Sequence, residues 1–272
     1  MSQGGVLFVT GYASSLRVER GHLVVKSGEG RYIQENRFSR VSRPRIRRVL
    51  IYGKGGYTTW SALEWIEGVG ASFAFISRDG RLIASSGEAG PNQPSLRRAQ
   101  VLASHEGVGL EIARTLLTSK LEGQLALVRR ALPEKGAAIG VIEQALAALD
   151  AAESVKSALA LEAKAAAAYW GAWRDVRVRF ARADETRIPK HWSVFTERQS
   201  PLSTSARKAV TPAGAMLNYL YALAESECRL ALLAVGLDPG LGWAHRDAPY
   251  RDSAALDLLE PLRPLVDDYV MR

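Results

Sequence analysis

The pattern of hydrophobic and polar residues changes near residue 90. Before that point, short runs of β-branched and aromatic residues, bounded by glycine, predict β-strands. The predicted strands are Val6–Thr10, Leu23–Lys26, Val49–Tyr52 and Ala71–Ser77. After the last of them, Arg78–Arg81 contains the dipeptide Asp-Gly, which tolerates the positive φ of a tight turn and predicts a hairpin. The first part of the chain is therefore predicted to be rich in strands.

One short helix is expected within this part. Thr58 or Thr59 can act as its N-cap, and the apolar residues that follow at helical spacing would face the sheet. These apolar residues are Leu63, Trp65 and Ile66. A stretch rich in glycine and proline, residues 88–94, then indicates a linker.

After residue 90 the pattern is helical. Residues 95–132 and 139–173 are rich in Ala, Leu, Glu, Lys and Arg, with apolar residues three and four positions apart. Thr211–Pro212 predicts the start of a further helix, with threonine as N-cap and proline at the first position, and this helix ends near Gly236. A final helix is predicted from Asp252–Ser253 to the end of the chain.

Two irregular features accompany these helices. Residues 183–211 contain two prolines and many serine and threonine residues, and predict a long basic loop of the kind that is usually functional or mobile. Pro261 is expected to bend the last helix. Together the patterns predict an α+β fold: a small, sandwich-like β-rich domain with one short helix over residues 1–90, followed by a larger all-α domain over residues 91–272.

The composition is that of a globular protein. Of the 272 residues, 47% are hydrophobic and 24% are charged, which excludes a wholly disordered chain. No apolar stretch approaches the roughly 18 residues of a membrane span, and the N-terminus lacks the basic region and apolar core of a secretory signal. The single cysteine, Cys228, excludes a disulfide framework and a zinc site built on cysteine pairs. We therefore expect a cytoplasmic protein.

Positive charge is concentrated in two blocks. The chain has a formal net charge of +8. Arg31–Arg48 holds seven arginines and one acid, and Arg174–Lys208 holds nine basic residues and four acids, so the rest of the chain is slightly acidic. Such blocks are what a surface that follows a phosphate backbone needs. The alternative is that they are solvated faces and loops.

Several familiar motifs are incomplete or absent. Gly53–Gly56 follows a predicted strand but lacks the spacing and the terminal Lys-Ser/Thr of a phosphate-binding loop. The pair His105–Glu106 has no second histidine four residues after the first, which excludes a zinc-protease helix. The absence of G-x-S-x-G argues against a serine hydrolase.

One group of acids and a histidine is compatible with a metal site. His245 follows a glycine-rich segment, and Asp257 and Glu260 share one face of the next predicted helix because they are three residues apart. Glu162 lies between an apolar stripe and a run of alanines in an earlier helix. Carboxylates and an imidazole from three helices suit a hard or borderline divalent ion. The alternative is that the two glutamates pair with nearby arginines, such as Arg263, and that His245 packs in the core.

Three segments, in this order, strongly resemble the integrase of CRISPR adaptation, the Cas1 family of CRISPR-associated endonucleases. They are Leu217–Leu223, Gly236–His245 and Ser253–Pro264. Upstream, Leu161–Ala163 followed by Tyr169–Trp170 is similar to the first acidic motif of the family. The resemblance covers most of the chain and is most specific between residues 155 and 265.

The resemblance implies a divalent-metal-dependent DNA endonuclease and strand-transfer integrase. Glu162, His245 and Glu260 match the positions of the family's ligands for Mg²⁺ or Mn²⁺, and Asp257 matches an additional active-site acid. In the implied reaction, a 3′-hydroxyl of a short double-stranded DNA attacks a phosphodiester of the CRISPR repeat. With water as the nucleophile, the same chemistry cleaves DNA.

The resemblance also implies partners. Members of the family form homodimers through the β-rich half, and two dimers bridge a small ferredoxin-like second CRISPR-associated protein. Members commonly continue with further helices and a basic tail. A truncated C-terminal domain is therefore one expectation for this sequence, and a short variant that binds DNA less well is the other.

Basic residues are expected to bind the phosphates of DNA, so that binding is sensitive to salt. The predicted DNA-binding residues are Arg174, Arg177, Arg179, Arg182, Lys190, Arg198, Arg207 and Lys208 in the C-terminal half, and Arg45, Arg47 and Arg48 in the N-terminal half. Four aromatic residues lie among the first group and can stack on unpaired bases, although core packing is expected of at least two. They are Tyr169, Trp170, Trp173 and Trp192.

The sequence leaves three other functions open. A stand-alone or transposon-borne homologue would carry the same site and integrate mobile DNA. A repair nuclease would use water as its nucleophile and lack the partner protein. A non-catalytic DNA-binding scaffold would keep the acids and the histidine only as a polar core.

Overall fold

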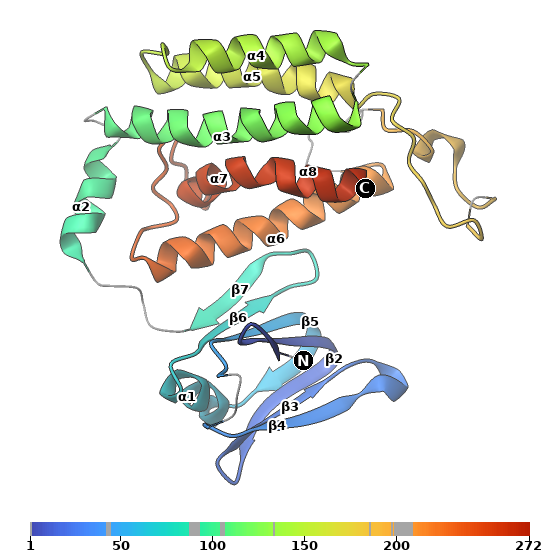
Figure 1. Cartoon of the computed structure of the whole chain (residues 1–272). Helices are drawn as coiled ribbons and strands as arrows, with labels where there is room; N and C mark the ends of the chain where they lie inside the picture. The colour runs from blue at the N-terminus through green and yellow to red at the C-terminus, as the bar shows by residue number, and fades with distance from the viewer. Residues whose placement is uncertain are drawn as a thin grey trace. The chain divides into compact units, whose positions relative to one another are not determined.

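The computed structural model describes residues 2–41, 45–86, 93–103, 107–132, 134–184, 186–196, 198 and 209–272. The chain divides into two compact units (Figure 1). One contains the strand-rich part up to residue 92, and the other is formed by Gln93–Leu232 and Leu237–Arg272. The predicted α+β class, with strands followed by helices, is confirmed.

The strands form one mixed sheet. Their bounds are β1 (Ser2–Gln3), β2 (Val6–Glu19), β3 (His22–Ser27), β4 (Gln34–Phe38), β5 (Arg48–Thr58), β6 (Ser72–Ile76) and β7 (Leu82–Ser86). The order across the sheet is β4-β3-β2-β5-β6-β7, and β1 pairs with β2. Strands β2, β5 and β6 are parallel to one another, and the other pairs are antiparallel. Ala13 and Gly55 have positive φ and interrupt the β2–β5 ladder, so the sandwich-like region is a single irregular sheet.

Three of the predicted strands lie within β2, β3 and β5, and the fourth, Ala71–Ser77, extends one residue beyond β6 at each end. The predicted hairpin turn is also present. Gly80 has a φ of 82°, and the Ser77 N–H donates to the Arg81 carbonyl across 2.9 Å. The edge strand β4 was not predicted, because none of its residues is buried. It pairs with β3 along its whole length, and its Glu35 also accepts a hydrogen bond of 2.9 Å from Arg17 on β2.

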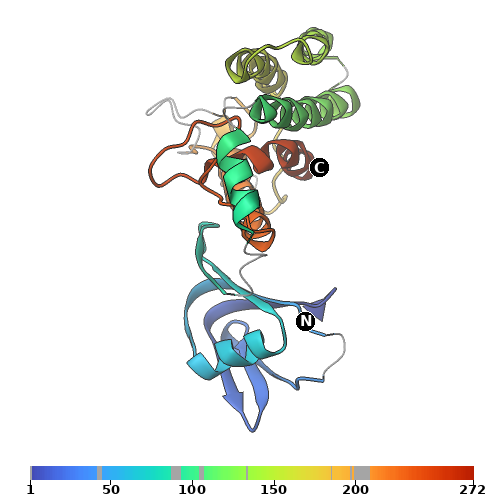
Figure 2. The same ribbon diagram turned by 90° about the vertical axis from the view of Figure 1, so that its left-hand side faces the viewer.

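Helix α1 (Trp60–Gly68) packs against the sheet, as the sequence predicts (Figure 2). Thr59 is its N-cap, and the Thr59 hydroxyl accepts a hydrogen bond of 3.3 Å from the Ala62 N–H. Trp65 and Ile66 are buried against strand residues of the core. The indole N–H of Trp65 donates to the Gly21 carbonyl, 2.9 Å away, which satisfies the polar atom of a buried ring.

The second unit is helical. Its elements are α2 (Pro94–Ala103), α3 (Val108–Ala131), α4 (Gly136–Leu149), α5 (Val155–Ala172), α6 (Pro212–Ala234), α7 (Ser253–Leu259) and α8 (Arg263–Met271), with short 3-10 turns η2 (Lys190–Trp192) and η3 (Glu260–Leu262). Each of the predicted regions 95–132 and 139–173 contains two helices. The second region is divided because Ser154 caps α5 in a reciprocal pair of hydrogen bonds with Ser157.

The predicted ends of the later helices are present. The Thr211 hydroxyl accepts a hydrogen bond of 3.2 Å from the Gly214 N–H at the start of α6. Gly236 has a φ of 83° just beyond the end of that helix. Pro261 lies in η3, between α7 and α8, where its missing N–H interrupts the α-helical hydrogen bonds. The expected bend is therefore a 3-10 turn, and this turn carries Glu260.

Helices α3, α4 and α5 pack against one another, and α3 also contacts η3, α7 and α8 (Figures 1 and 2). The described part of the predicted basic loop is irregular apart from η2, and an isolated bridge joins Arg177 to Val194. Within the described ranges, no helix combines the length and the apolar content needed to cross a membrane.

Candidate active site

A lysine and two glutamates meet in the helical unit. The ammonium nitrogen of Lys120, on α3, lies 2.5 Å from Oε1 of Glu162 on α5 and 2.5 Å from Oε2 of Glu260 in η3. The exposed fractions of the three side chains are 9%, 14% and 7%. Two carboxylates that are far apart in the sequence thus converge on one buried point, and a positive charge occupies that point.

Close packing of α3 against the start of α8 brings this lysine to the acids. Gly123 is one turn after Lys120 on α3, and a Cβ at this glycine would lie 2.8 Å from the Cβ of Pro264. Since real Cβ atoms do not approach so closely, only glycine permits this contact. The lysine follows one buried leucine, Leu117, and precedes another, Leu121. Sequence reasoning missed Lys120, although a lysine inside an apolar stripe is a signal that a buried partner exists.

His245 is held by the fully buried carboxylate of Asp257. Oδ2 of Asp257 accepts hydrogen bonds from the N–H groups of Trp243 and Ala244, at 2.5 and 2.9 Å. Oδ1 accepts the N–H of His245 at 2.8 Å, and the Nδ1 atom of the imidazole lies 2.5 Å from the same oxygen. This leaves Nε2 of His245 directed to Glu260, 4.0 Å from its Oε1 atom.

The loop before His245 follows the carboxylate closely. A Cβ at Gly242 would lie 2.6 Å from the carbonyl oxygen of His245 and 3.1 Å from Oδ2 of Asp257. Glycine at this position therefore allows successive N–H groups to point at one carboxylate. Asp257 acts on this loop as an anchor, and it orients the imidazole through the same contacts.

Glu260 also pairs with Arg263, as the alternative interpretation of the sequence proposed. Nε of Arg263 donates to Oε1 of Glu260 across 3.0 Å, and its guanidinium lies over the ring of Tyr221. Burial opposes ionisation of Glu260, but the charges of Lys120 and Arg263 outweigh it and lower the pKa of this carboxyl. Glu260 is therefore held as an anion. Glu162 pairs with Lys120 and not with an arginine among the described ion pairs.

In the described ranges, no three histidine, cysteine, aspartate or glutamate side chains are grouped so as to hold a metal ion in their present positions. The donor chemistry nevertheless fits Mg²⁺ or Mn²⁺, because Glu162, Glu260 and His245 supply two carboxylates and an imidazole nitrogen. Oε2 of Glu260 is buried and pairs with the Lys120 ammonium, 2.5 Å away.

A second buried acid lies behind the site. Asp267, on α8, is fully buried and accepts hydrogen bonds from the hydroxyls of Tyr169, at 2.8 Å, and Tyr221. Burial raises the pKa of Asp267 to about 6, and the two hydroxyls offset part of that effect. Arg198 places its guanidinium over the rings of Trp170 and Tyr221, so this arginine packs on aromatic residues next to the buried acid.

The aromatic residues near this cluster mainly pack in the core. Tyr169 and Trp173 are buried, which confirms core packing for at least two of the four candidates. Trp170 is half-buried and contacts the rings of Tyr169, Trp173 and Phe195. Trp192 is also half-buried.

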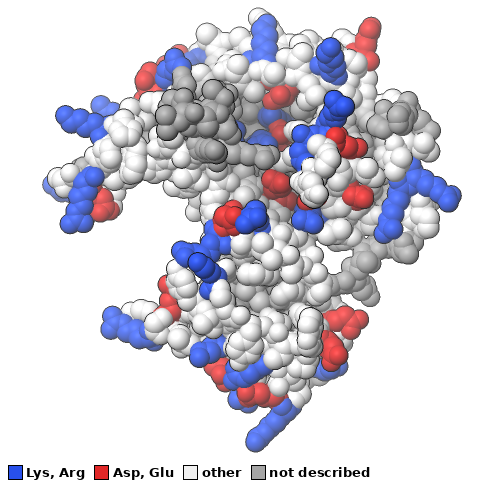
Figure 3. Space-filling view, turned by 180° about the vertical axis from the view of Figure 1, so that it is seen from behind, with Lys and Arg blue, Asp and Glu red and all other residues white. Residues whose placement is uncertain are grey.

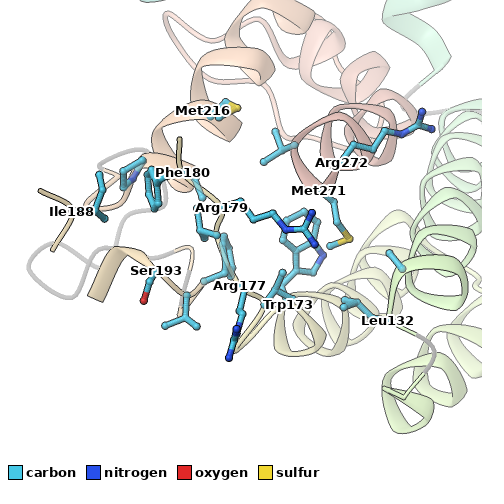
Figure 4. A pocket seen from close by; sticks show the side chains of 18 of the residues that line it. Leu132, Trp173, Arg177, Arg179, Phe180, Ile188, Ser193, Met216, Met271 and Arg272 are labelled. Atoms are coloured by element: carbon cyan, nitrogen blue, oxygen red, sulfur yellow. The ribbon is translucent and has the colours of Figure 1, made fainter. Parts of the chain in front are cut away.

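Other predicted DNA-binding residues lie beside a groove of about 1440 Å³. Arg177 and Arg179 are exposed and line this groove together with the rings of Trp173 and Phe180 (Figure 4). Lys190 also lines it, whereas Arg174 and Arg182 are exposed outside its lining. Arg207 and Lys208 lie outside the described residues.

The N-terminal basic residues contact the backbone of their own unit. Arg45 donates to the Val69 carbonyl, just after α1, and Arg47 donates to the Gly4 carbonyl, both across 2.7 Å. Arg48 is half-buried. On the face in Figure 3, basic side chains are spread widely, with acidic side chains between them. The arginines of this block thus include residues with structural contacts of their own.

The comparison of the sequence with protein families identifies one match. The family model described as CRISPR associated protein Cas1 matches residues 7–272. A relative from Rhodospirillum rubrum, named CRISPR-associated endonuclease Cas1 2, is 30% identical to this chain. The match covers 96% of this chain and 73% of the relative.

Solved structures agree with this match. A structure titled "Casposase bound to integration product" has a TM-score of 0.74 and 27% identity, and the match covers 98% of this chain and 71% of that one. A partial Cas6-RT-Cas1–Cas2 complex has a TM-score of 0.63 over 99% of this chain and 75% of that one. Its identity of 18% shows a shared fold alone.

Proposed function

Because the chain belongs to the Cas1 family of CRISPR-associated proteins, we propose that it is a divalent-metal-dependent integrase of CRISPR adaptation. It joins the 3′-hydroxyl ends of short double-stranded DNA to a CRISPR repeat, and it cleaves DNA when water replaces the hydroxyl. The observation that carries this proposal is that Glu162 and Glu260, from separate segments, meet at one buried point, with Nε2 of His245 4.0 Å from Oε1 of Glu260.

Each residue of the site has a part in this chemistry. Glu162, Glu260 and Nε2 of His245 would hold Mg²⁺ or Mn²⁺, which when bound polarises the attacked phosphate and stabilises the leaving oxygen. Asp257 keeps the imidazole in place through Nδ1, so that Nε2 faces Glu260. Arg263 keeps Glu260 ionised. In the transfer itself, the attacking 3′ oxygen forms a bond to phosphorus while the bond to the repeat's own 3′ oxygen breaks.

The exposed arginines supply binding energy for DNA. Arg177 and Arg179, at the groove after α5, are placed to neutralise backbone phosphates without reading the base sequence. The proposed partners are a second copy of the chain, joined through the β-rich unit, and a small ferredoxin-like CRISPR-associated protein. The shared fold with a chain solved in a Cas1–Cas2 complex supports the second partner.

A second candidate is a stand-alone integrase of mobile DNA. The similarity to a casposase solved with its integration product favours this candidate, because that protein is 27% identical to this chain. Both candidates use the same site and the same reaction. They differ in the DNA that receives the new end, which is a CRISPR repeat in the first case only.

Strand transfer tests the proposal. A labelled duplex with free 3′-hydroxyl ends is incubated with supercoiled plasmids that carry or lack a CRISPR repeat, in Mn²⁺ or in EDTA. We expect joining with Mn²⁺ and none with EDTA. The rate of joining should fall by at least about 100-fold in Glu260→Gln, since the loss of one electrostatic contact in an active site typically has an effect of this size. The matched control is Glu111→Gln, which removes an exposed acid from α3 and should retain joining.

The outcomes separate the candidates. Joining that depends on the repeat supports CRISPR adaptation, and equal joining to both plasmids supports the stand-alone integrase. Tight, salt-sensitive DNA binding without joining in any condition contradicts both and supports the scaffold.

A further inference from the structure

The charge at the centre of the site belongs to the protein itself. The Lys120 ammonium is the only cation within contact distance of both Glu162 and Glu260 among the described ion pairs, and its nitrogen lies 2.5 Å from an oxygen of each. Mg²⁺ binds oxygen at about 2.0–2.1 Å. An ammonium group and a divalent ion held by the same two oxygens would therefore occupy the same space.

We propose that Lys120 is the resident counter-cation of the Glu162–Glu260 pair, and that its ammonium must leave this position before a divalent ion is bound. The lysine thereby sets the affinity for the metal and holds the two acids together in the metal-free protein. This inference rests on the proposed metal site, and it adds a residue that competes with the metal for that site.

Burial explains why the metal-free protein needs such a group. Two carboxylates this close, with exposed fractions of 14% and 7%, would repel each other without a cation between them. Arg263 does not replace Lys120, because it contacts Oε1 of Glu260 and has no described contact with Glu162. The lysine, in contrast, contacts both acids.

The Lys120 side chain can also move away from the two glutamates. Its ammonium lies 2.5 Å from one oxygen of each acid and has no other partner among the described ion pairs. A lysine is a point charge on a flexible stem, so its ammonium can move while the helix backbone stays in place. A fixed arginine fork between the same acids would be harder to displace.

Mn²⁺ binding to the full chain tests the inference without relying on activity. The signal of free Mn²⁺ in electron paramagnetic resonance gives the affinity at pH 8 for the wild-type protein, Lys120→Met and Lys120→Arg. We expect Lys120→Met to bind Mn²⁺ at least about tenfold more tightly, because the competing charge is gone. Its melting temperature should be lower than that of the wild type without metal and should rise further with Mn²⁺.

Three variants complete the design. Lys120→Arg keeps a competing positive charge that is harder to displace, so this variant should bind Mn²⁺ several-fold more weakly than the wild type. It tests the inference even if Lys120→Met does not fold. Lys164→Met removes the same charge from an exposed position on α5 and should leave the Mn²⁺ affinity unchanged. Glu162→Gln should abolish binding and so assigns the signal to this site.

The inference is overturned if Lys120→Met binds Mn²⁺ no more tightly than the wild type, or if Lys120→Arg binds it as tightly. A lysine with a purely structural role would give weaker binding in both variants. Failure of the proposed function is a separate result: Mn²⁺ binding would then be absent from the wild type, or present and unaffected by Glu162→Gln.

Discussion

The buried carboxylates of this protein have different roles, and the contacts of each carboxylate explain its role. Both oxygens of Asp257 are occupied by the loop that precedes His245, so this acid serves to position the imidazole. Glu260 is shared between the Lys120 ammonium and the Arg263 guanidinium. Asp267 is enclosed by tyrosine hydroxyls and is away from the groups that face Lys120.

The pKa of Asp267 leads to a prediction about stability. Burial raises this pKa to about 6 from an ordinary value of 3.8, so between these values the folded protein binds more protons than the unfolded chain. The free energy of unfolding must then fall as the pH rises through this window. We expect the stability of the wild type relative to Asp267→Asn to fall by about 2 kcal/mol between pH 4.5 and pH 7, as measured by urea unfolding.

The neighbouring acid provides the control. Hydrogen bonds from Arg272 and Arg130 lower the pKa of Asp268 to about 2, so its titration in the folded protein lies below this window. Asp268→Asn should therefore leave the pH dependence between pH 4.5 and pH 7 parallel to that of the wild type. Parallel curves for Asp267→Asn as well would contradict the role assigned to its burial.

At the scale of elements, the site depends on the interruption of the last helical stretch at Pro261 and on the close contact between α3 and α8. Pro261 converts the middle of the last helical stretch into the turn η3, which carries Glu260. Gly123 allows α3 to approach Pro264 at the start of α8. Lys120 lies one turn before this contact, so the distance between α3 and α8 determines whether the ammonium reaches Glu260.

Replacing each of two helical glycines with alanine is therefore expected to change the stability in opposite directions. Gly123→Ala places a Cβ 2.8 Å from Pro264, and we expect it to destabilise the protein by about 1–3 kcal/mol through overpacking. Gly140, within α4, has no atom within 4 Å of an added Cβ, so Gly140→Ala should stabilise the protein by about 1 kcal/mol. Urea unfolding of both variants measures this difference, and effects of the same sign would show that the contact at Pro264 does not limit the packing.

At the scale of the whole molecule, part of the positive charge is already paired within the protein. Arg45 and Arg47 hold backbone carbonyls, and Arg129 and Arg130 pair with Glu143 and Asp268. Arg177 and Arg179, which line the groove after α5, have no partner among the described ion pairs. Net charge alone therefore overstates the surface that is available to DNA.

This division predicts which arginines control the salt dependence of DNA binding. If Arg177 and Arg179 each neutralise a phosphate, replacing both with glutamine should make the slope of log K against log salt shallower by about 2. Replacing the ion-paired Arg129 and Arg130 in the same way should change it less. Fluorescence anisotropy with a labelled duplex measures both slopes, and equal changes would remove the groove from the proposed DNA surface.

The sequence by itself determined the elements and many of their ends. Hydrophobic periodicity predicted the strands of the first unit and the helices of the second, because it reports which face of an element is buried. Thr59, Pro212 and Gly236 predicted helix ends because capping depends on local hydrogen bonds and local φ angles. The acids and His245 were selected by residue type and by a resemblance to one family.

Only the tertiary structure decided what surrounds those acids. Lys120 is 42 residues before Glu162 in the chain, and no local pattern relates the two. Their contact exists because α3 packs against α5 and η3, and this packing depends on shape complementarity summed over many residues. The edge strand β4 was not predicted for a related reason, since its backbone pairing with β3 forms only in the folded chain and none of its residues is buried. Local sequence encodes capping and periodicity, whereas the charge at the centre of this site follows from contacts that form only in the folded chain.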